Sequence, residues 1–169
     1  LLRLRRGERR EQDINEMSRF STWDLDKSYY AEVLGYEPDN AKHRAEIAAT
    51  RHAVHQRIAD STDGIVFIKT HNCLVMDRGH STINFAVTSG AAYVVRNPLD
   101  VAISYAHHTG ATIDQAIEGM ALSDSESRGR EDSVYEVVGS WSQHVGSWTR
   151  NPHRALHVMR YEDMLADPE

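Results

Sequence analysis

The feature that most constrains the fold is a set of three short, mainly apolar runs, at residues 65–68, 91–95 and 155–159, of which the third is interrupted by His157. Each has the length of one strand. An uninterrupted apolar run of that length indicates a strand buried on both faces, as in a parallel sheet. The stretches between the runs have helical patterns, and strands that alternate with helices need crossover connections. The sequence therefore predicts an α/β domain in which helices flank a parallel sheet.

Apolar spacing and helix-breaking residues mark the helices. Ile47, Val54 and Ile58 recur at the spacing of one helical face, which predicts a helix over residues 38–60. By the same criteria we expect helices over residues 97–108, 113–121, 134–150 and 163–166, a loop-rich connection with short helices over residues 12–35, and a mobile surface loop over residues 123–133.

Composition excludes several classes of protein. The chain has 169 residues, enough for one domain, and a net charge of −6, which makes it a poor general ligand for nucleic-acid phosphates. Cys73 is the only cysteine, so an intrachain disulfide and a CxxC metal site are both excluded. No apolar run approaches the roughly 20 residues that span a bilayer. We expect a cytoplasmic, soluble domain without a nucleic-acid or membrane partner.

Histidines on the predicted helix over residues 38–60 raise the question of a metal. His52 and His55 are three positions apart, but no third ligand stands at a matching spacing. We therefore expect surface histidines and no metal site.

Polar side chains follow the first apolar run. Lys69 and His71 are two positions apart in extended chain, so both point the same way. Ligands of open α/β sheets bind at the carboxyl ends of strands. There a lysine neutralises charge on a transferring group, and a histidine takes a proton. The pair alone does not decide between such a site and ordinary polar residues.

Arg96 ends the second run, and Asn97 and Pro98 then begin a helix as N-cap and first helical residue. A helix start with free N–H groups binds anions, and arginine adds a fork for phosphate. Ser104 follows within the same helix. In the alternative interpretation Arg96 pairs with Asp100 and Ser104 has no special role.

Tyr161 follows the third run. An aromatic ring at a strand end can stack on a purine, although buried packing is the commoner role of a tyrosine.

Four blocks occur together in a characteristic order: IKTH at residues 68–71, YVVRNPLDVAISY at 93–105, GSWSQHV at 139–145 and RYEDM at 160–164. In these blocks the chain resembles the cytosolic-type sulfotransferases that use 3′-phosphoadenosine 5′-phosphosulfate (PAPS), and most of all their bacterial branch. The resemblance covers residues 60–169. It implies a P-loop-like parallel sheet, a partial sulfotransferase domain over residues 1–169, and sulfuryl transfer from PAPS to a hydroxyl or amine of a small acceptor, without a metal.

The resemblance also implies roles for individual residues. Lys69 matches the lysine that contacts the transferring sulfuryl group, and His71 matches the general base. Arg96 and Ser104 match the pair that holds the 3′-phosphate of PAPS, and Tyr161 matches an aromatic position near the adenine. Loops over a rigid sheet carry specificity, so we expect acceptor contacts from residues 72–90 and 123–133.

Two features of the family do not occur in the sequence. The Gly/Ser-rich loop with a lysine that holds the 5′-phosphosulfate is absent, since Gly7 is followed by Glu8, Arg9 and Arg10. The Gly- and Lys-containing segment that closes over the 3′-phosphate is absent as well. We therefore expect a piece of a longer protein, with the first strand and its loop missing, that is inactive by itself.

Two other classes of protein remain open from the residues. A P-loop nucleoside kinase or ATPase needs a Walker-type loop and a magnesium-binding carboxylate at a strand end. His71 and Arg96 stand at the strand ends instead. The other class is a non-catalytic domain of the same fold, which the missing loop favours and the intact polar residues oppose.

Overall fold

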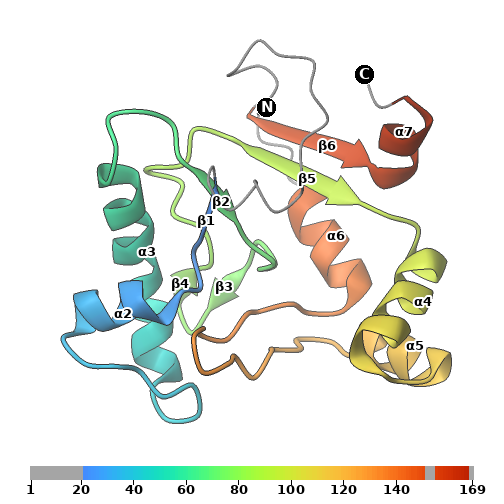
Figure 1. The fold of residues 1–169 in the computed structure, drawn as a ribbon, viewed down its shortest axis with the longest axis horizontal. Helices are drawn as coiled ribbons and strands as arrows, with labels where there is room; N and C mark the ends of the chain where they lie inside the picture. The colour runs from blue at the N-terminus through green and yellow to red at the C-terminus, as the bar shows by residue number, and fades with distance from the viewer. Residues whose placement is uncertain (1–20, 151–154, 168–169) are drawn as a thin grey trace.

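The computed structural model describes residues 21–150 and 155–167, and within them it alternates strands with helices (Figure 1). No helix in these ranges is long and apolar enough to cross a membrane. The elements in chain order are β1 (Ser21–Trp23), α2 (Lys27–Leu34), α3 (Arg44–Asp60), β2 (Phe67–Lys69), β3 (Met76–Asp77), β4 (His80–Ser81), β5 (Ala91–Val95), α4 (Pro98–Thr109), α5 (Ile113–Ala121), α6 (Trp141–Thr149), β6 (Leu156–Arg160) and α7 (Tyr161–Ala166).

The strands form small parallel pairs. β1 pairs with β2, with Thr22 opposite Ile68, and β5 pairs with β6, with Tyr93 opposite Val158. β3 and β4 form a short antiparallel hairpin. The predicted α/β class, with parallel strands and flanking helices, is confirmed, but within the described ranges the two parallel pairs are not joined in one sheet.

β1 and α2 lie in the segment that was predicted to be loop-rich. Asp26 caps α2, because its side chain accepts a hydrogen bond from the main-chain N–H of Ser28. Gly35 ends the helix in the left-handed conformation, with φ of 78°. The three residues of β1 form a strand because they pair with β2. The local sequence pattern does not reveal a pairing with a distant segment, so this strand was not predicted. Residues 12–20 of this segment lie outside the described part of the chain.

The expectation that the strands are buried on both faces is wrong: Ile68 of β2 is 36% exposed and Val158 of β6 is 42% exposed, and β5 has an exposed face as well. Tyr93 stacks on Trp148 of α6, with ring centroids 5.7 Å apart, whereas Val94 is 46% exposed. Neighbouring residues of a strand point to opposite faces, and in the described part of the chain α6 covers the face that carries Tyr93. The apolar run thus belongs to a strand with one covered face.

The main core lies against α3. Ile47, Val54 and Ile58 are buried there, as their spacing predicts. The helix begins at Arg44 instead of residue 38, because the side chain of Asp39 accepts hydrogen bonds from two following main-chain N–H groups and forms a separate turn. The core cluster consists of Leu25, Tyr30, Ile47, Val54, Ile58, Val134 and Tyr135.

The predicted helix over residues 134–150 is wrong in its first half. α6 begins at Trp141, after Gly139 with φ of 65°. Ser140 and Gln143 form a reciprocal capping box, in which each side chain accepts from the main-chain N–H of the other residue. The preceding residues are extended, and Val134 and Tyr135 are drawn into the core. Tertiary packing thus overrides the helical pattern there.

The helices around the second predicted site match the sequence closely. α4 has Asn97 as N-cap and Pro98 as its first residue, and Gly110 ends it in the left-handed conformation. α5 has the predicted bounds. Residues 123–133 contain no helix and none of the strands β1–β6. The predicted polar connection over residues 72–90 contains the β3–β4 hairpin.

Candidate functional site

Lys69 and His71 lie where β2 ends. Lys69 is the last residue of β2, opposite Trp23 of β1, and it is exposed. His71 follows two positions later and is also exposed. The intervening Thr70 does not extend the strand, since its hydroxyl accepts hydrogen bonds from the main chain and side chain of Asn72. Both predicted residues therefore reach solvent at the carboxyl end of a parallel strand.

His71 is held by two contacts from other elements. Its Nδ1 lies 2.8 Å from Oε1 of Glu136, in the extended segment before α6. Its main-chain oxygen accepts a hydrogen bond from Nε2 of His144, in α6, at 3.1 Å. Within the described residues, Nε2 of His71 has no hydrogen-bond partner. This nitrogen is thus left free to meet a ligand.

His144 connects His71 to β5. Because its Nε2 donates to a carbonyl, its Nδ1 is the acceptor for the Tyr93 hydroxyl, at 3.0 Å. Burial lowers the pKa of His144 below 6.5, and burial also raises the pKa of Tyr93 to about 12. The imidazole of His144 is therefore neutral at pH 7, and its two hydrogen bonds link α6 to β5 and to the main chain of His71.

Arg96 lies between β5 and α4, half-buried. Its guanidinium carbon is 4.8 Å from the centroid of the Tyr161 ring, at the start of α7. Its Nε is buried and has no hydrogen-bond partner in the part of the chain that the structure describes. Within the described ranges no carboxylate forms a salt bridge with Arg96, so the alternative pairing with Asp100 does not occur there. The structure brings two predicted site residues together and, in the described ranges, leaves the guanidinium of Arg96 without a salt bridge, although its charge helps to lower the pKa of Glu162.

The start of α4 offers fewer free N–H groups than the sequence suggests. The Asn97 side chain accepts from the N–H of Leu99, and Pro98 has no N–H. Glu162 accepts from the N–H of Asn97 at 2.7 Å. That hydrogen bond lowers the pKa of Glu162. An anion at this helix start therefore relies mainly on side chains.

Ser104 is exposed on α4, and no hydrogen bond joins it to Arg96 among the described residues. Lys69 and His71 belong to the β1–β2 pair, whereas Arg96 and Tyr161 belong to the β5–β6 pair. Four of the five predicted residues thus form two groups, each at the carboxyl ends of a parallel pair, and Ser104 lies apart from them within α4.

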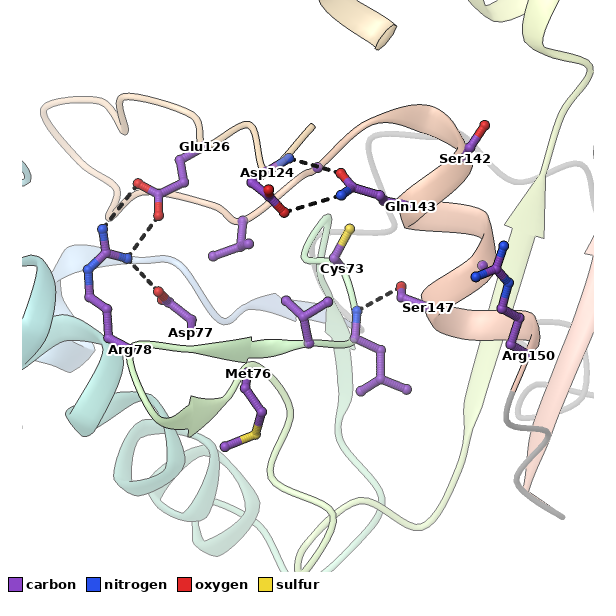
Figure 2. A pocket seen from close by; sticks show the side chains of 15 residues that line it. Cys73, Met76, Asp77, Arg78, Asp124, Glu126, Ser142, Gln143, Ser147 and Arg150 are labelled. Carbon is purple, nitrogen blue, oxygen red and sulfur yellow. Dashed lines mark hydrogen bonds and ion pairs between the residues drawn. The ribbon is translucent and has the colours of Figure 1, made fainter. Parts of the chain in front are cut away.

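A pocket of about 780 Å³ opens between α6 and the chain that leads into the β3–β4 hairpin (Figure 2). It is lined by residues 73–78, by Asp124 and Glu126, and by one face of α6. Arg78 reaches Glu126 on one wall, and Gln143 bonds Asp124 on another. None of the five predicted site residues lines this pocket, although both loops expected to contact an acceptor do.

A buried ionic network lies beside this pocket and was not foreseen from the sequence. Arg51 is fully buried and donates to Asp77, which also accepts from Tyr135 at 2.5 Å. Burial alone would raise the pKa of Asp77. Hydrogen bonds from Tyr135 and Arg51, with the charge of Arg51, outweigh burial and hold it below 3.8. The network ties α3 to β3.

The expectation of surface histidines on α3 is wrong for His55. It is buried, its Nε2 lies 3.2 Å from Asp24, and its Nδ1 accepts from the N–H of Asn84. His52 is partly buried, with its Nε2 3.0 Å from the main-chain oxygen of Ser81. The described residues hold no cluster of three or more metal-ligating side chains.

A scan against models of protein families matches residues 80–169, more than half of the chain, to the sulfotransferase domain. The chain belongs to the sulfotransferase domain family, whose general chemistry is transfer of a sulfuryl group. No curated protein matches the chain. Arg96, Ser104 and Tyr161 lie within the matched residues, whereas Lys69 and His71 precede them.

Proposed function

We propose that the protein transfers a sulfuryl group from PAPS to a hydroxyl or amine of a small acceptor. Arg96, Ser104 and Tyr161 bind the nucleotide part of the donor, and Lys69 and His71 act on the reacting groups. The family fixes the class of reaction, and the side chains at the strand ends support the choice of donor.

The observation that carries this proposal is the half-buried guanidinium of Arg96, which forms no salt bridge with the described residues. Its buried Nε also lacks an acceptor among them, and only the longer-range charge of Glu162 acts on it, which favours an anion as its ligand. The ring of Tyr161 lies under the guanidinium and restrains its position. PAPS offers such an anion in its 3′-phosphate. The hydroxyl of Ser104 supplies a second, neutral donor from α4.

The second group performs the transfer. The acceptor oxygen or nitrogen attacks sulfur in line with the bond to the 5′-phosphate oxygen. The new bond to sulfur forms as that older bond breaks. The proton of the acceptor passes to Nε2 of His71, and the bisphosphate nucleotide leaves with the electrons of the broken bond. Lys69 neutralises the charge on the moving sulfuryl oxygens.

The acceptor contacts come from residues 72–90 and 123–133 in this proposal. Cys73 follows His71 by two positions and lines the pocket, and Asp124 and Glu126 line it from the other segment. Loops near a catalytic group, supported by rigid helices, are where specificity residues concentrate.

The role of His71 is tested by turnover. In the full-length protein, His71→Ala should lower kcat by about 10²–10⁴ without weakening donor binding, because a general base acts only in the transition state. Transfer of labelled sulfate from PAPS measures kcat, and calorimetry measures donor affinity. His108→Ala removes an exposed histidine from the last turn of α4, outside the segments proposed to contact the acceptor, and should change neither. A His71→Ala variant as active as the His108→Ala control contradicts the assignment.

A further inference from the structure

The imidazole of His71 has a carboxylate partner that the sequence did not suggest. Nδ1 of His71 and Oε1 of Glu136 are 2.8 Å apart. The His71 side chain is 52% exposed and that of Glu136 only 16%. The carboxylate of Glu136 is thus largely buried beside the Nδ1 edge of the His71 ring, and the rest of the ring is exposed to solvent.

This contact selects one tautomer of His71. An ionised carboxylate only accepts hydrogen bonds, so Nδ1 carries the hydrogen and Nε2 carries the lone pair. A general base needs an unprotonated nitrogen on the side where the acceptor arrives. The carboxylate of Ser-His-Asp triads holds its histidine in the same way.

Glu136 is itself held rigidly. Its main-chain N–H donates to the Ser127 hydroxyl at 2.8 Å, and its main-chain oxygen accepts from the N–H of Ser127 at 2.9 Å. Two bonds to one residue fix this part of the extended segment against the loop over residues 123–133. The carboxylate therefore starts from a defined position.

The neighbours of Glu136 and His71 are also tied to each other. The buried side chain of Asn72 accepts from the N–H of Val137 at 2.8 Å and donates to the Thr70 hydroxyl at 3.2 Å. The N–H of Cys73 donates to the main-chain oxygen of Val137 at 2.7 Å. These bonds join the chain on both sides of His71 to the residue that follows Glu136. The pairing of the two side chains is thus built into the fold.

We propose that Glu136 is the positioning residue of His71: it fixes the tautomer in which Nε2 is free to take the acceptor proton. The proposal rests on the proposed function, in which His71 is the base. Glu136 does not touch the reacting atoms in this account and acts through the imidazole.

The tautomer is read directly by NMR. In the ¹⁵N-labelled chain without donor or acceptor, at a pH above the usual histidine range of about 6.5, long-range ¹H–¹⁵N correlations should show His71 protonated at Nδ1. Glu136→Ala should shift His71 towards protonation at Nε2. Glu136→Gln should do the same, since its amide can donate to Nδ1. His71→Ala assigns the signals.

Glu131→Gln is the matched control, because Glu131 is an exposed acid of the preceding loop. It should leave the His71 tautomer unchanged. Glu136→Gln keeps the size of the side chain, and its melting temperature should stay close to that of the control. A His71 tautomer that is the same in the wild type, Glu136→Gln and Glu136→Ala overturns the proposal. Equal affinity for nucleotides with and without a 3′-phosphate overturns the proposed function instead, so the two failures are distinguishable.

Turnover supplies the second readout. In the full-length protein, Glu136→Gln should lower kcat by about 10²-fold or more, up to the 10⁴-fold that a positioned base contributes, with the KM for PAPS unchanged. In a His71→Ala background, the same change should have no further effect, because the residue acts through His71. An equal loss in both backgrounds contradicts the positioning role.

Discussion

The guanidinium of Arg96 lies over the ring of Tyr161 although the two residues follow different strands: the guanidinium carbon is 4.8 Å from the ring centroid. The contact forms because β5 and β6 are parallel and in register, with Val95 opposite Arg160, so that the next residue of each strand emerges at the same end. A cation over an aromatic face keeps its N–H groups at the edge available for other partners. In our account the ring of Tyr161 therefore holds the guanidinium of Arg96 in place before an anion binds.

The first prediction concerns Tyr161. Tyr161→Ala should weaken binding of 3′,5′-bisphosphoadenosine by about 2- to 30-fold, which corresponds to the roughly 0.5–2 kcal/mol of a cation–π contact. Tyr161→Phe keeps the ring and should retain most of the affinity. Tyr36→Ala removes an exposed tyrosine on another part of the molecule and serves as the control. Calorimetric titration of the wild type and the three variants with 3′,5′-bisphosphoadenosine measures these affinities. Equal affinity in Tyr161→Ala and the control contradicts the stacking role.

The second prediction follows from the lowered pKa of His144. As pH falls below about 6.5, the unfolded chain takes up a proton at this residue that the folded chain does not, so the free energy of unfolding decreases. The loss is at most about 1.4 kcal/mol per pH unit. His144→Gln keeps a donor for the main-chain oxygen of His71 and removes the titration. Denaturant unfolding between pH 5 and 7.5 should give a smaller loss of stability for this variant. Parallel curves for both proteins contradict the prediction.

The third prediction concerns Asp77. Asp77→Asn leaves the buried charge of Arg51 without its counter-ion, which should lower the free energy of unfolding by about 3–5 kcal/mol at neutral pH. Because the pKa of Asp77 is lowered in the folded chain, its contribution is present above about pH 3.9 and is lost as the pH falls further. The stability difference between wild type and variant should shrink in acid.

Asp132→Asn, in the exposed loop, is the control for the third prediction and should leave stability within about 0.5 kcal/mol of wild type. Urea unfolding at several pH values measures all three proteins. A difference between wild type and Asp77→Asn that stays constant into acid would count against the account of this network.

The parts of the fold that sequence predicts well have local signals. α4 is bounded by an N-cap asparagine, a proline in its first turn and a terminal glycine, all adjacent in sequence to the helix, so its bounds can be predicted from local sequence alone. β1 and the extended segment at Val134 and Tyr135 have no such signals. Their conformations depend on pairing with β2 and on burial against α3, which are contacts between distant parts of the chain. The capping box of Ser140 and Gln143 is a local signal for the start of α6, but the apolar spacing before it suggested a helix that begins at residue 134.

The candidate site divides in the same way. Lys69, His71 and Arg96 are recognisable because each follows an apolar run, and strand ends are where ligands bind in α/β sheets. Glu136 is 65 positions away from His71, and no motif connects the two. Only the fold places that acid beside the ring.

The nucleotide preference of Arg96 tests the central claim most directly. Calorimetry on the full-length wild-type protein should show 3′,5′-bisphosphoadenosine binding about 10- to 150-fold more tightly than 5′-AMP, as a charge-assisted contact of about 1.5–3 kcal/mol implies. Arg96→Ala should remove most of that preference with little effect on 5′-AMP, and Arg96→Lys should restore part of it. Equal affinity of the wild type for both nucleotides, or tightest binding of ATP with magnesium, would contradict a PAPS-dependent sulfotransferase.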